Sequence, residues 1–386
     1  MTDSLLQWRA EFPILDTCTY LVSHSLGAMP RRASAYLAQF AEEWNTRGVR
    51  AWHEGWWEIG RAMGDRLAPI VGAAPGTITM HQNVTVAQAI VASCFSFAGP
   101  RRTIVLQDLD FPTNHYLFEG FRRYGAEIVY VKSEDSVRAP IERLVDAIDE
   151  RTALVPISLV LFRSACLQDV RPVIERAHRV GAAVVLDVYQ AAGAVPMSLA
   201  DLGVDFAVGG SVKWLCGGPG AAYLYVRPDL MGRMRPAIAG WAGHAAPFAF
   251  ERGAIRGAEG IERFQTGTPN VPALSAARGG YEIVAAIGVP AIREKSLRLT
   301  RRMMAAADER GWPIHTPRAD DERGGTVVID VPGGARVADE LIRRGVIVDH
   351  RPDAGIRLAP HFYNTEEDVD KAIGVMTELL STWNLT

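Results

Sequence analysis

The fold of this chain is indicated by one stretch, Asp205-Phe206-Ala207-Val208-Gly209-Gly210-Ser211-Val212-Lys213-Trp214-Leu215-Cys216-Gly217-Gly218-Pro219-Gly220. It opens as an apolar run and closes as a glycine-rich turn that carries a single lysine, Lys213. Upstream, residues 182–187 form a continuous apolar run that ends in an acid, Asp187. Such a run is typical of a strand buried on both faces of a parallel sheet. Because another apolar run follows at residues 221–226, Lys213 is predicted to lie between two strands, where the ligands of open α/β sheets bind.

The same alternation of strand and helix patterns extends to both sides of this stretch. Apolar runs at residues 103–106, 128–131 and 154–157 are separated by helical patterns, which predicts β-α units on a mostly parallel sheet. After about residue 265 the pattern changes to longer helices and short strands. We therefore predict an α/β fold with a large domain at residues 50–264 and a small α+β domain formed by residues 1–49 and 265–386.

Composition restricts the class of protein. The 386 residues are 48% hydrophobic, which is enough for a sizeable core, and the formal net charge of -3 gives no basic surface for nucleic acid. No apolar run reaches the roughly 18 residues that span a bilayer. The start, Met1-Thr2-Asp3-Ser4, does not read as a signal peptide, so a cytoplasmic enzyme is expected. The cysteines lack the spacing of a zinc site or a disulfide framework, and no metal site is predicted; they are Cys18, Cys94, Cys166 and Cys216.

Lys213 and Asp187 together predict pyridoxal 5'-phosphate as cofactor. A lysine in this position supplies the amine for a Schiff base, and an aspartate keeps the pyridine nitrogen protonated so that the ring accepts electrons. Any lysine taken alone is more often a solvated surface residue. The apolar strand that ends in Asp187 favours the cofactor site.

Further residues suit the phosphate and the ring of such a cofactor. Val84 and Thr85 precede a helical run and offer free amides and a hydroxyl, although helix capping alone also accounts for Thr85. Ser211 offers a second hydroxyl near Lys213. Phe111 ends a loop after a predicted strand, and its ring is either a stacking platform for the pyridine or part of the core.

Four polar or aromatic residues complete the predicted site. Gln190 either donates to the phenolic oxygen of the ring or caps the end of a strand. Arg357 suits the carboxylate of an α-amino acid, and a structural ion pair is its alternative. Trp241 lies on a glycine-flanked loop where its indole N–H can donate to a phosphate oxygen. Thr268 lies in a similar polar turn.

These segments resemble the fold-type I pyridoxal phosphate enzymes of the class V aminotransferase group, and among them most of all kynureninase. The resemblance runs from about Tyr20 to Ile373. It is carried by the stretch quoted above and by residues 186–196, His24-Ser25-Leu26-Gly27, Phe111-Pro112-Thr113, residues 240–244 and residues 293–300.

The resemblance implies a mostly parallel seven-stranded sheet between helices and a homodimer whose subunits share each active site. It assigns the Schiff base to Lys213 and the partner of the ring nitrogen to Asp187. The other roles that it implies are ring stacking by Phe111, phosphate binding by Thr85 and by Trp241 of the neighbouring subunit, and substrate binding by Arg357, His24 and Ser25.

Kynureninase-like chemistry is hydrolytic cleavage of a Cβ–Cγ bond that releases alanine, a step of tryptophan catabolism. Two positions depart from the kynureninase pattern, because Val212 replaces a tyrosine and Gln190 replaces a histidine. A class V aminotransferase, an epimerase or a β-lyase acting on another amino acid is therefore an alternative. A degenerate protein that binds the cofactor without turnover is another. Persulfide formation is disfavoured because no cysteine follows Cys216.

Overall fold

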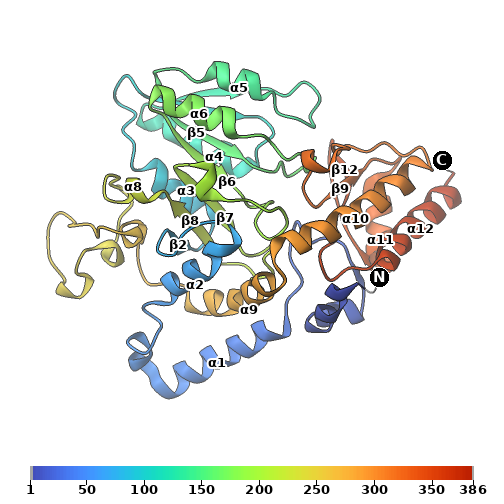
Figure 1. The fold of residues 1–386 in the computed structure, drawn as a ribbon, viewed down its shortest axis with the longest axis horizontal. Helices are drawn as coiled ribbons and strands as arrows, with labels where there is room; N and C mark the ends of the chain where they lie inside the picture. Colours follow the sequence, from blue (N-terminus) through green and yellow to red (C-terminus); the bar gives the residue numbers. More distant parts are fainter. Residues whose placement is uncertain (1–2, 385–386) are drawn as a thin grey trace.

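The computed structural model describes residues 3–384 as a large twisted sheet between helices with a smaller sheet beside it (Figure 1). The seven strands of the large sheet follow the order β2-β8-β7-β6-β5-β3-β4. Neighbouring strands from β7 to β4 are parallel, and β8 is antiparallel to both of its neighbours. The predicted α/β fold with a mostly parallel sheet is confirmed. The strands are β2 (Ile78–His81), β3 (Thr103–Gln107), β4 (Glu127–Val131), β5 (Thr152–Ser158), β6 (Ala183–Asp187), β7 (Phe206–Gly210) and β8 (Ala222–Val226).

Helices cover both faces of this sheet, which is why its central strands are buried throughout and mostly apolar. Every residue of β3, β5, β6, β7 and β8 is buried. Val185 and Val208 belong to the core on one face, and Leu186 and Ala207 belong to the core on the other. The helices of this part are α2 (Ile59–Leu67), α3 (Val84–Ala92), α4 (Pro112–Gly120), α5 (Ile141–Ala147), α6 (Arg171–Val180), α7 (Leu199–Leu202) and α8 (Pro228–Met231).

The smaller part is built around a three-stranded antiparallel sheet with a hydrophobic core of its own. Its strands have the order β11-β12-β9, and the last helix begins with a capping box between Thr365 and Asp368. The helices and strands after residue 289 follow the predicted pattern, except β11, which the sequence pattern did not indicate. They are α10 (Val289–Asp308), β9 (Val327–Ile329), α11 (Gly334–Arg343), β10 (Val346–Ile347), β11 (Asp349–Arg351), β12 (Gly355–Leu358) and α12 (Glu366–Thr382).

The N-terminal segment contacts both parts. Strand β1 (Thr19–Tyr20) pairs in parallel with β10 of the smaller part. Helix α1 (Arg31–Arg47) instead lies along α9 (Val271–Ile287), below the large sheet in the view of Figure 1. The sequence pattern did not indicate α1 or α9. The domain boundaries at residues 49 and 264 stay a prediction, and residues 1–2 and 385–386, with the start Met1-Thr2, lie outside the described residues.

Two further observations concern the chain as a whole. Among residues 3–384, none of the helices is both long enough and apolar enough to cross a lipid bilayer. The same part of the chain contains no cluster of three or more His, Cys, Asp or Glu side chains that could hold a metal ion. Its four cysteines are unpaired thiols, and two of them, Cys166 and Cys216, are buried.

Candidate active site

A cavity of about 210 Å³ opens at the carboxyl ends of β5 and β6, beside the first turns of α3 and α4. This edge of a parallel sheet is where α/β proteins bind ligands, because the loops that leave the strands diverge there. The residues that line the cavity come from five separate stretches of sequence. They are Asn83, Val84, Thr85, Phe111, Thr113, Ser158, Val160, Phe162, Asp187, Tyr189, Gln190 and Lys213.

Lys213 lies three residues beyond the end of β7, and its Nζ atom faces two aromatic rings. Nζ is 4.4 Å from the centroid of Tyr189 and 5.7 Å from the centroid of Phe111. Burial lowers the pKa of Lys213 to about 8, and Arg357 acts in the same direction, while Asp187 opposes the shift. About a tenth of the amine is therefore neutral at pH 7, far more than for an ordinary lysine, and a nucleophile must be neutral.

Asp187 is the last residue of β6 and is only 7% exposed. Its Oδ1 accepts a hydrogen bond from the backbone N–H of Tyr189 at 2.8 Å. Burial raises the pKa of Asp187, although this hydrogen bond and the charge of Lys213 both favour the carboxylate. Within residues 3–384 no hydrogen bond engages Oδ2, so that oxygen can accept a hydrogen bond from a protonated ring nitrogen.

The N-terminus of α3 forms the anion-binding end of the cavity. Asn83 caps the helix, because its Oδ1 accepts from the backbone N–H of Val86 at 3.0 Å. The N–H groups of Val84 and Thr85 belong to the first turn and have no intrahelical acceptor. With the positive end of the helix dipole they suit a phosphate group. Asn83 was not assigned a role from the sequence, although an Asn before an apolar helix is a regular N-cap signal.

Phe111 precedes the first residue of α4, Pro112, and 46% of its surface is exposed. One edge contact is present, since its ring meets that of Phe162 at 5.1 Å between centroids and 83° between planes. The remaining surface can be covered by a planar ligand. This placement supports the stacking role predicted for Phe111.

Gln190 connects the lysine loop to the N-terminal segment. Its Oε1 accepts from the indole N–H of Trp214 at 2.9 Å, and its Nε2 donates to the carbonyl of His24 at 3.1 Å. One N–H of the amide remains for a ligand. The carbonyl of Trp214 also accepts from Nε2 of His361 at 2.7 Å, so the residue after Lys213 is held from both parts of the molecule.

Arg357 lies directly behind the cavity wall and is 3% exposed. It donates to both carboxylate oxygens of Asp349, at 2.7 and 2.5 Å, and to the carbonyl of Phe162 at 2.8 Å. Three of the five N–H groups of the guanidinium are thereby used, and two remain for a carboxylate. The predicted ion pair of Arg357 is present, with Asp349 as its partner, and its role on a substrate carboxylate stays a prediction that the free N–H groups allow.

Asp349 was not recognised from the sequence. It lies on β11 directly opposite Arg357 on β12, and only the register of these two strands brings them together. Nε2 of His24 is 3.1 Å from Oδ1 of Asp349, and Arg351 also contacts this carboxylate. Burial lowers the pKa of His24 to about 4, so this imidazole is neutral at physiological pH. Neither His24 nor its half-buried neighbour Ser25 lines the cavity.

Ser211 does not reach the cavity. It continues the alternation of Ala207 and Gly209, whose side of β7 faces α9. Its hydroxyl donates to the carbonyl of Ala221 at 2.5 Å and lies 2.6 Å from the hydroxyl of Tyr281. The sequence-based placement of Ser211 on the phosphate therefore has no support from the geometry.

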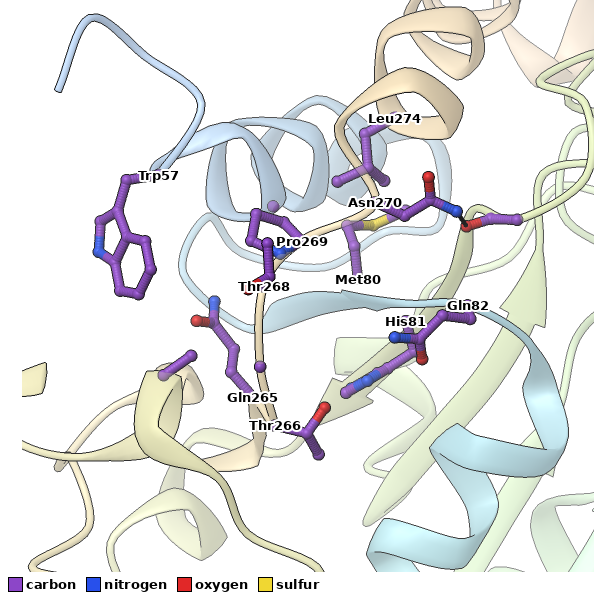
Figure 2. A pocket seen from close by; sticks show the side chains of 14 residues that line it. Trp57, Met80, His81, Gln82, Gln265, Thr266, Thr268, Pro269, Asn270 and Leu274 are labelled. Atoms are coloured by element: carbon purple, nitrogen blue, oxygen red, sulfur yellow. Dashed lines mark hydrogen bonds between the residues drawn. The ribbon is translucent and has the colours of Figure 1, made fainter. Parts of the chain in front are cut away.

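Trp241 and Thr268 also lie outside the cavity of Lys213. Trp241 packs on Trp57, with 4.7 Å between ring centroids. Thr268 lines a separate pocket of about 30 Å³, where the segment 265–270 runs past His81 and Gln82 (Figure 2). Neither Lys213 nor Asp187 lines that pocket. Within one chain these two residues are therefore not part of the lysine site.

The groups that do converge fit pyridoxal 5'-phosphate. A weakly basic lysine amine, a buried carboxylate and a helix start with free amides match the aldehyde, the ring nitrogen and the phosphate of this cofactor. The fold and the site together define a pyridoxal phosphate enzyme of fold type I.

Comparison with known proteins identifies the family. Residues 19–372 match the Aminotransferase class-V family, and the chain belongs to it. It is 33% identical to a kynureninase of Burkholderia pseudomallei strain K96243 over 398 residues, which covers 98% of this chain and 93% of the relative. A kynureninase of Pseudomonas fluorescens is 32% identical over 396 residues, covering 99% of this chain and 94% of the relative. The cofactor is pyridoxal 5'-phosphate.

Solved structures agree on the fold. The apo cysteine desulfurase of Thermococcus onnurineus NA1 superposes with a TM-score of 0.86 at 20% identity, covering 97% of this chain and 98% of the other. A C-DES mutant with glycine covalently linked to its PLP cofactor gives a TM-score of 0.85 at 20% identity, with 96% and 99% coverage. At these identities the likeness concerns the fold alone.

Proposed function

We propose that this enzyme cleaves the Cβ–Cγ bond of an α-amino acid that has a γ-carbonyl group, with addition of water, as a kynureninase does. The observation that carries the proposal is the identity of 33% to kynureninases over nearly the whole chain. The convergence of Lys213 and Asp187 in one cavity supports it, because the reaction needs both a base and an electron-accepting cofactor.

The side chains in and behind the cavity have separate roles in the proposed reaction. The cofactor, when bound, accepts the electron pair that is left at Cα. Lys213, with its pKa near 8, takes and returns the proton at Cα. Asp187 holds a proton on the ring nitrogen. The two remaining N–H groups of Arg357 bind the substrate carboxylate, and Asp349 fixes the plane of the guanidinium.

Water completes the balance of the reaction. Its oxygen bonds to Cγ, the Cβ–Cγ bond breaks, and Cγ leaves as the carboxyl carbon of an aromatic acid. Cβ receives a proton, and the amino acid product is alanine. The pair of products, alanine and an aromatic acid, distinguishes hydrolysis from transamination, epimerisation and β-elimination.

A second candidate is transamination, epimerisation or β-elimination on another amino acid. It is favoured by Val212, since the position before Lys213 carries no hydroxyl, and by Gln190, whose amide is already engaged with Trp214. Persulfide chemistry has no support, because none of the four cysteines lines the cavity. A cofactor-binding protein without turnover would have no need for both Lys213 and Asp187 in one cavity.

We also propose a homodimer in which Trp241 and Thr268 of one subunit complete the site of the other. The proposal is supported by their position outside the cavity of their own chain and by the exposed surface around Trp241. That side chain is 40% exposed, and Phe250, stacked at 6.2 Å, is 71% exposed. Sedimentation should give the mass of two chains. A cytoplasmic location and a role in tryptophan catabolism stay predictions.

One assay tests the function. Purified enzyme is mixed with kynurenine, 3-hydroxykynurenine and a panel of other amino acids, and alanine, keto acids and racemised substrate are quantified. We expect stoichiometric alanine and aromatic acid from a kynurenine, and neither product from Lys213→Ala. Keto acid or racemisation without alanine would establish the second candidate instead.

A further inference from the structure

The cavity has a second aromatic side chain to which the sequence assigned no role. Tyr189 lines it together with Phe111, and the Nζ atom of Lys213 faces both rings, at 4.4 and 5.7 Å from their centroids. The atom that bonds the cofactor therefore lies close to two rings that come from different strand ends. A planar ligand attached to Lys213 would meet both.

The position of Tyr189 depends on a missing side chain in β7. A Cβ atom at Gly210 would overlap the ring carbon Cζ and the hydroxyl oxygen of Tyr189. The backbone of Gly210 does not have a positive φ, so any residue could adopt its conformation. Space for the phenol is thus the reason that a glycine is needed there.

The neighbouring glycine provides an internal comparison. A Cβ atom at Gly209 would overlap the hydroxyl of Tyr223. Because side chains alternate along a strand, Tyr223 lies on the opposite face of the sheet, in the core that faces α9. Two adjacent glycines therefore accommodate two tyrosines, of which only Tyr189 reaches the cavity.

We propose that Tyr189 forms the second face of the cofactor slot, so that the pyridine ring is held between Tyr189 and Phe111, with Gly210 kept free of a side chain to seat the phenol. Burial raises the pKa of Tyr189, so the phenol is neutral at working pH. Its electron-rich ring is attracted to a pyridine that carries a proton. This assignment concerns the cofactor and holds for whichever amino acid the enzyme uses.

The test compares shape and aromaticity at position 189 in the full-length protein. Tyr189→Phe keeps the ring, and its dissociation constant for pyridoxal phosphate should stay within about 3-fold of wild type. Tyr189→Leu keeps most of the apolar volume without a ring, and we expect the dissociation constant to rise about 10-fold. The visible circular dichroism of the bound cofactor should change in the leucine variant only.

Matched glycine variants test the seat of the phenol. Gly210→Ala should weaken cofactor binding about 10-fold, because the displaced phenol enters the slot. Gly209→Ala introduces the same strain against Tyr223 on the other face, and it should lower the melting temperature while leaving cofactor affinity unchanged. Thermal unfolding of each apo protein separates loss of folding from loss of the slot.

Two results would overturn the proposal. One is a leucine variant at position 189 that binds the cofactor with unchanged affinity and dichroism. The other is equal loss in Tyr189→Phe and Tyr189→Leu, which would assign the effect to the hydroxyl and not to the ring. No amino-acid substrate enters these measurements, so failure of the proposed hydrolysis leaves them unaffected.

Discussion

At the scale of single residues, the reactivity of Lys213 is set by the charges around it before any substrate arrives. Burial in the cavity lowers its pKa, Arg357 and Arg351 lower it further, and Asp187 and Asp349 act in the opposite direction. The amine must be neutral to attack the aldehyde of the cofactor. Its titration is therefore directly observable in the rate of cofactor attachment.

We expect the rate at which apo-enzyme takes up pyridoxal phosphate to rise with pH and to level off above about pH 8, the pKa of Lys213. Stopped-flow absorbance measures this profile. Because Arg351 lowers the pKa of Lys213, Arg351→Gln should move the midpoint to higher pH. Arg344→Gln serves as the control, because Arg344 pairs with Glu340 and Glu378 and is not among the charges that shift the pKa of Lys213. A midpoint near the ordinary lysine value of roughly 10.4 in wild type would contradict the argument.

The carboxylate role of Arg357 is tested by a substitution that keeps its charge. Arg357→Lys can still pair with Asp349, but a single ammonium group cannot also offer two parallel N–H donors to a substrate. We expect KM for the amino acid to rise at least about 10-fold, with the absorbance of the bound cofactor unchanged. An unchanged KM would show that the carboxylate binds elsewhere.

At the scale of elements, α9 is the helix on which the lysine loop rests. A Cβ atom at Gly280 would overlap the carbonyl of Leu215, and one at Gly279 would press on the backbone of Ala33 in α1. These glycines allow α9 to approach both the lysine loop and α1 closely. They also weaken the helix pattern in the sequence, which is one reason why α9 was not predicted.

Gly280→Ala should therefore destabilise the protein in spite of the better helix propensity of alanine. We expect a loss of about 1–3 kcal/mol in the free energy of unfolding, from overpacking against Leu215. The control is Gly374→Ala in α12, where the new Cβ meets no atom within 4 Å, and a gain of about 0.5–1 kcal/mol is expected. Denaturant unfolding of the apo proteins measures both. Equal effects would refute the close approach.

Local patterns predicted most strands of the large sheet and the two central residues of the site, but neither α1 and α9 nor the contacts that depend on strand register. Lys213 and Asp187 follow apolar strands in the sequence, so each could be placed at a strand end without a structure. The pairing of Arg357 with Asp349 depends on how β12 aligns with β11, which the sequence does not display. Ser211 was placed on the wrong face because the alternation of β7 continues one residue beyond the strand.

At the scale of the whole molecule, three buried histidines make the fold sensitive to acid. Burial lowers the pKa values of His24, His81 and His361 to about 4. Between about pH 6.5 and pH 4 the unfolded chain therefore binds protons that the folded chain does not, and stability falls as pH falls. Each histidine accounts for up to about 3 kcal/mol. Asp110, whose pKa burial raises to about 6, opposes the trend.

His81 is the cleanest of these groups to test, because burial is the sole cause of its shift. We expect His81→Gln to reduce the slope of unfolding free energy against pH below about pH 6.5 by one proton or less. Measurements at pH 7.5 and pH 5 in the same denaturant suffice. A slope identical to that of wild type would show that His81 titrates normally in the folded state.

The pairing of β1 with β10 has a consequence for biosynthesis. Thr19 and Tyr20 have as partners Val346 and Ile347, so the N-terminal strand emerges from the ribosome long before its partner exists. The segment that carries His24 cannot dock on Asp349 until then. The parallel sheet and Lys213 can form earlier, during translation. The contacts around Asp349 and Arg357, which are proposed to bind the substrate carboxylate, can therefore form only at the end of synthesis. A chain released before residue 346 would contain the lysine loop but would lack these contacts.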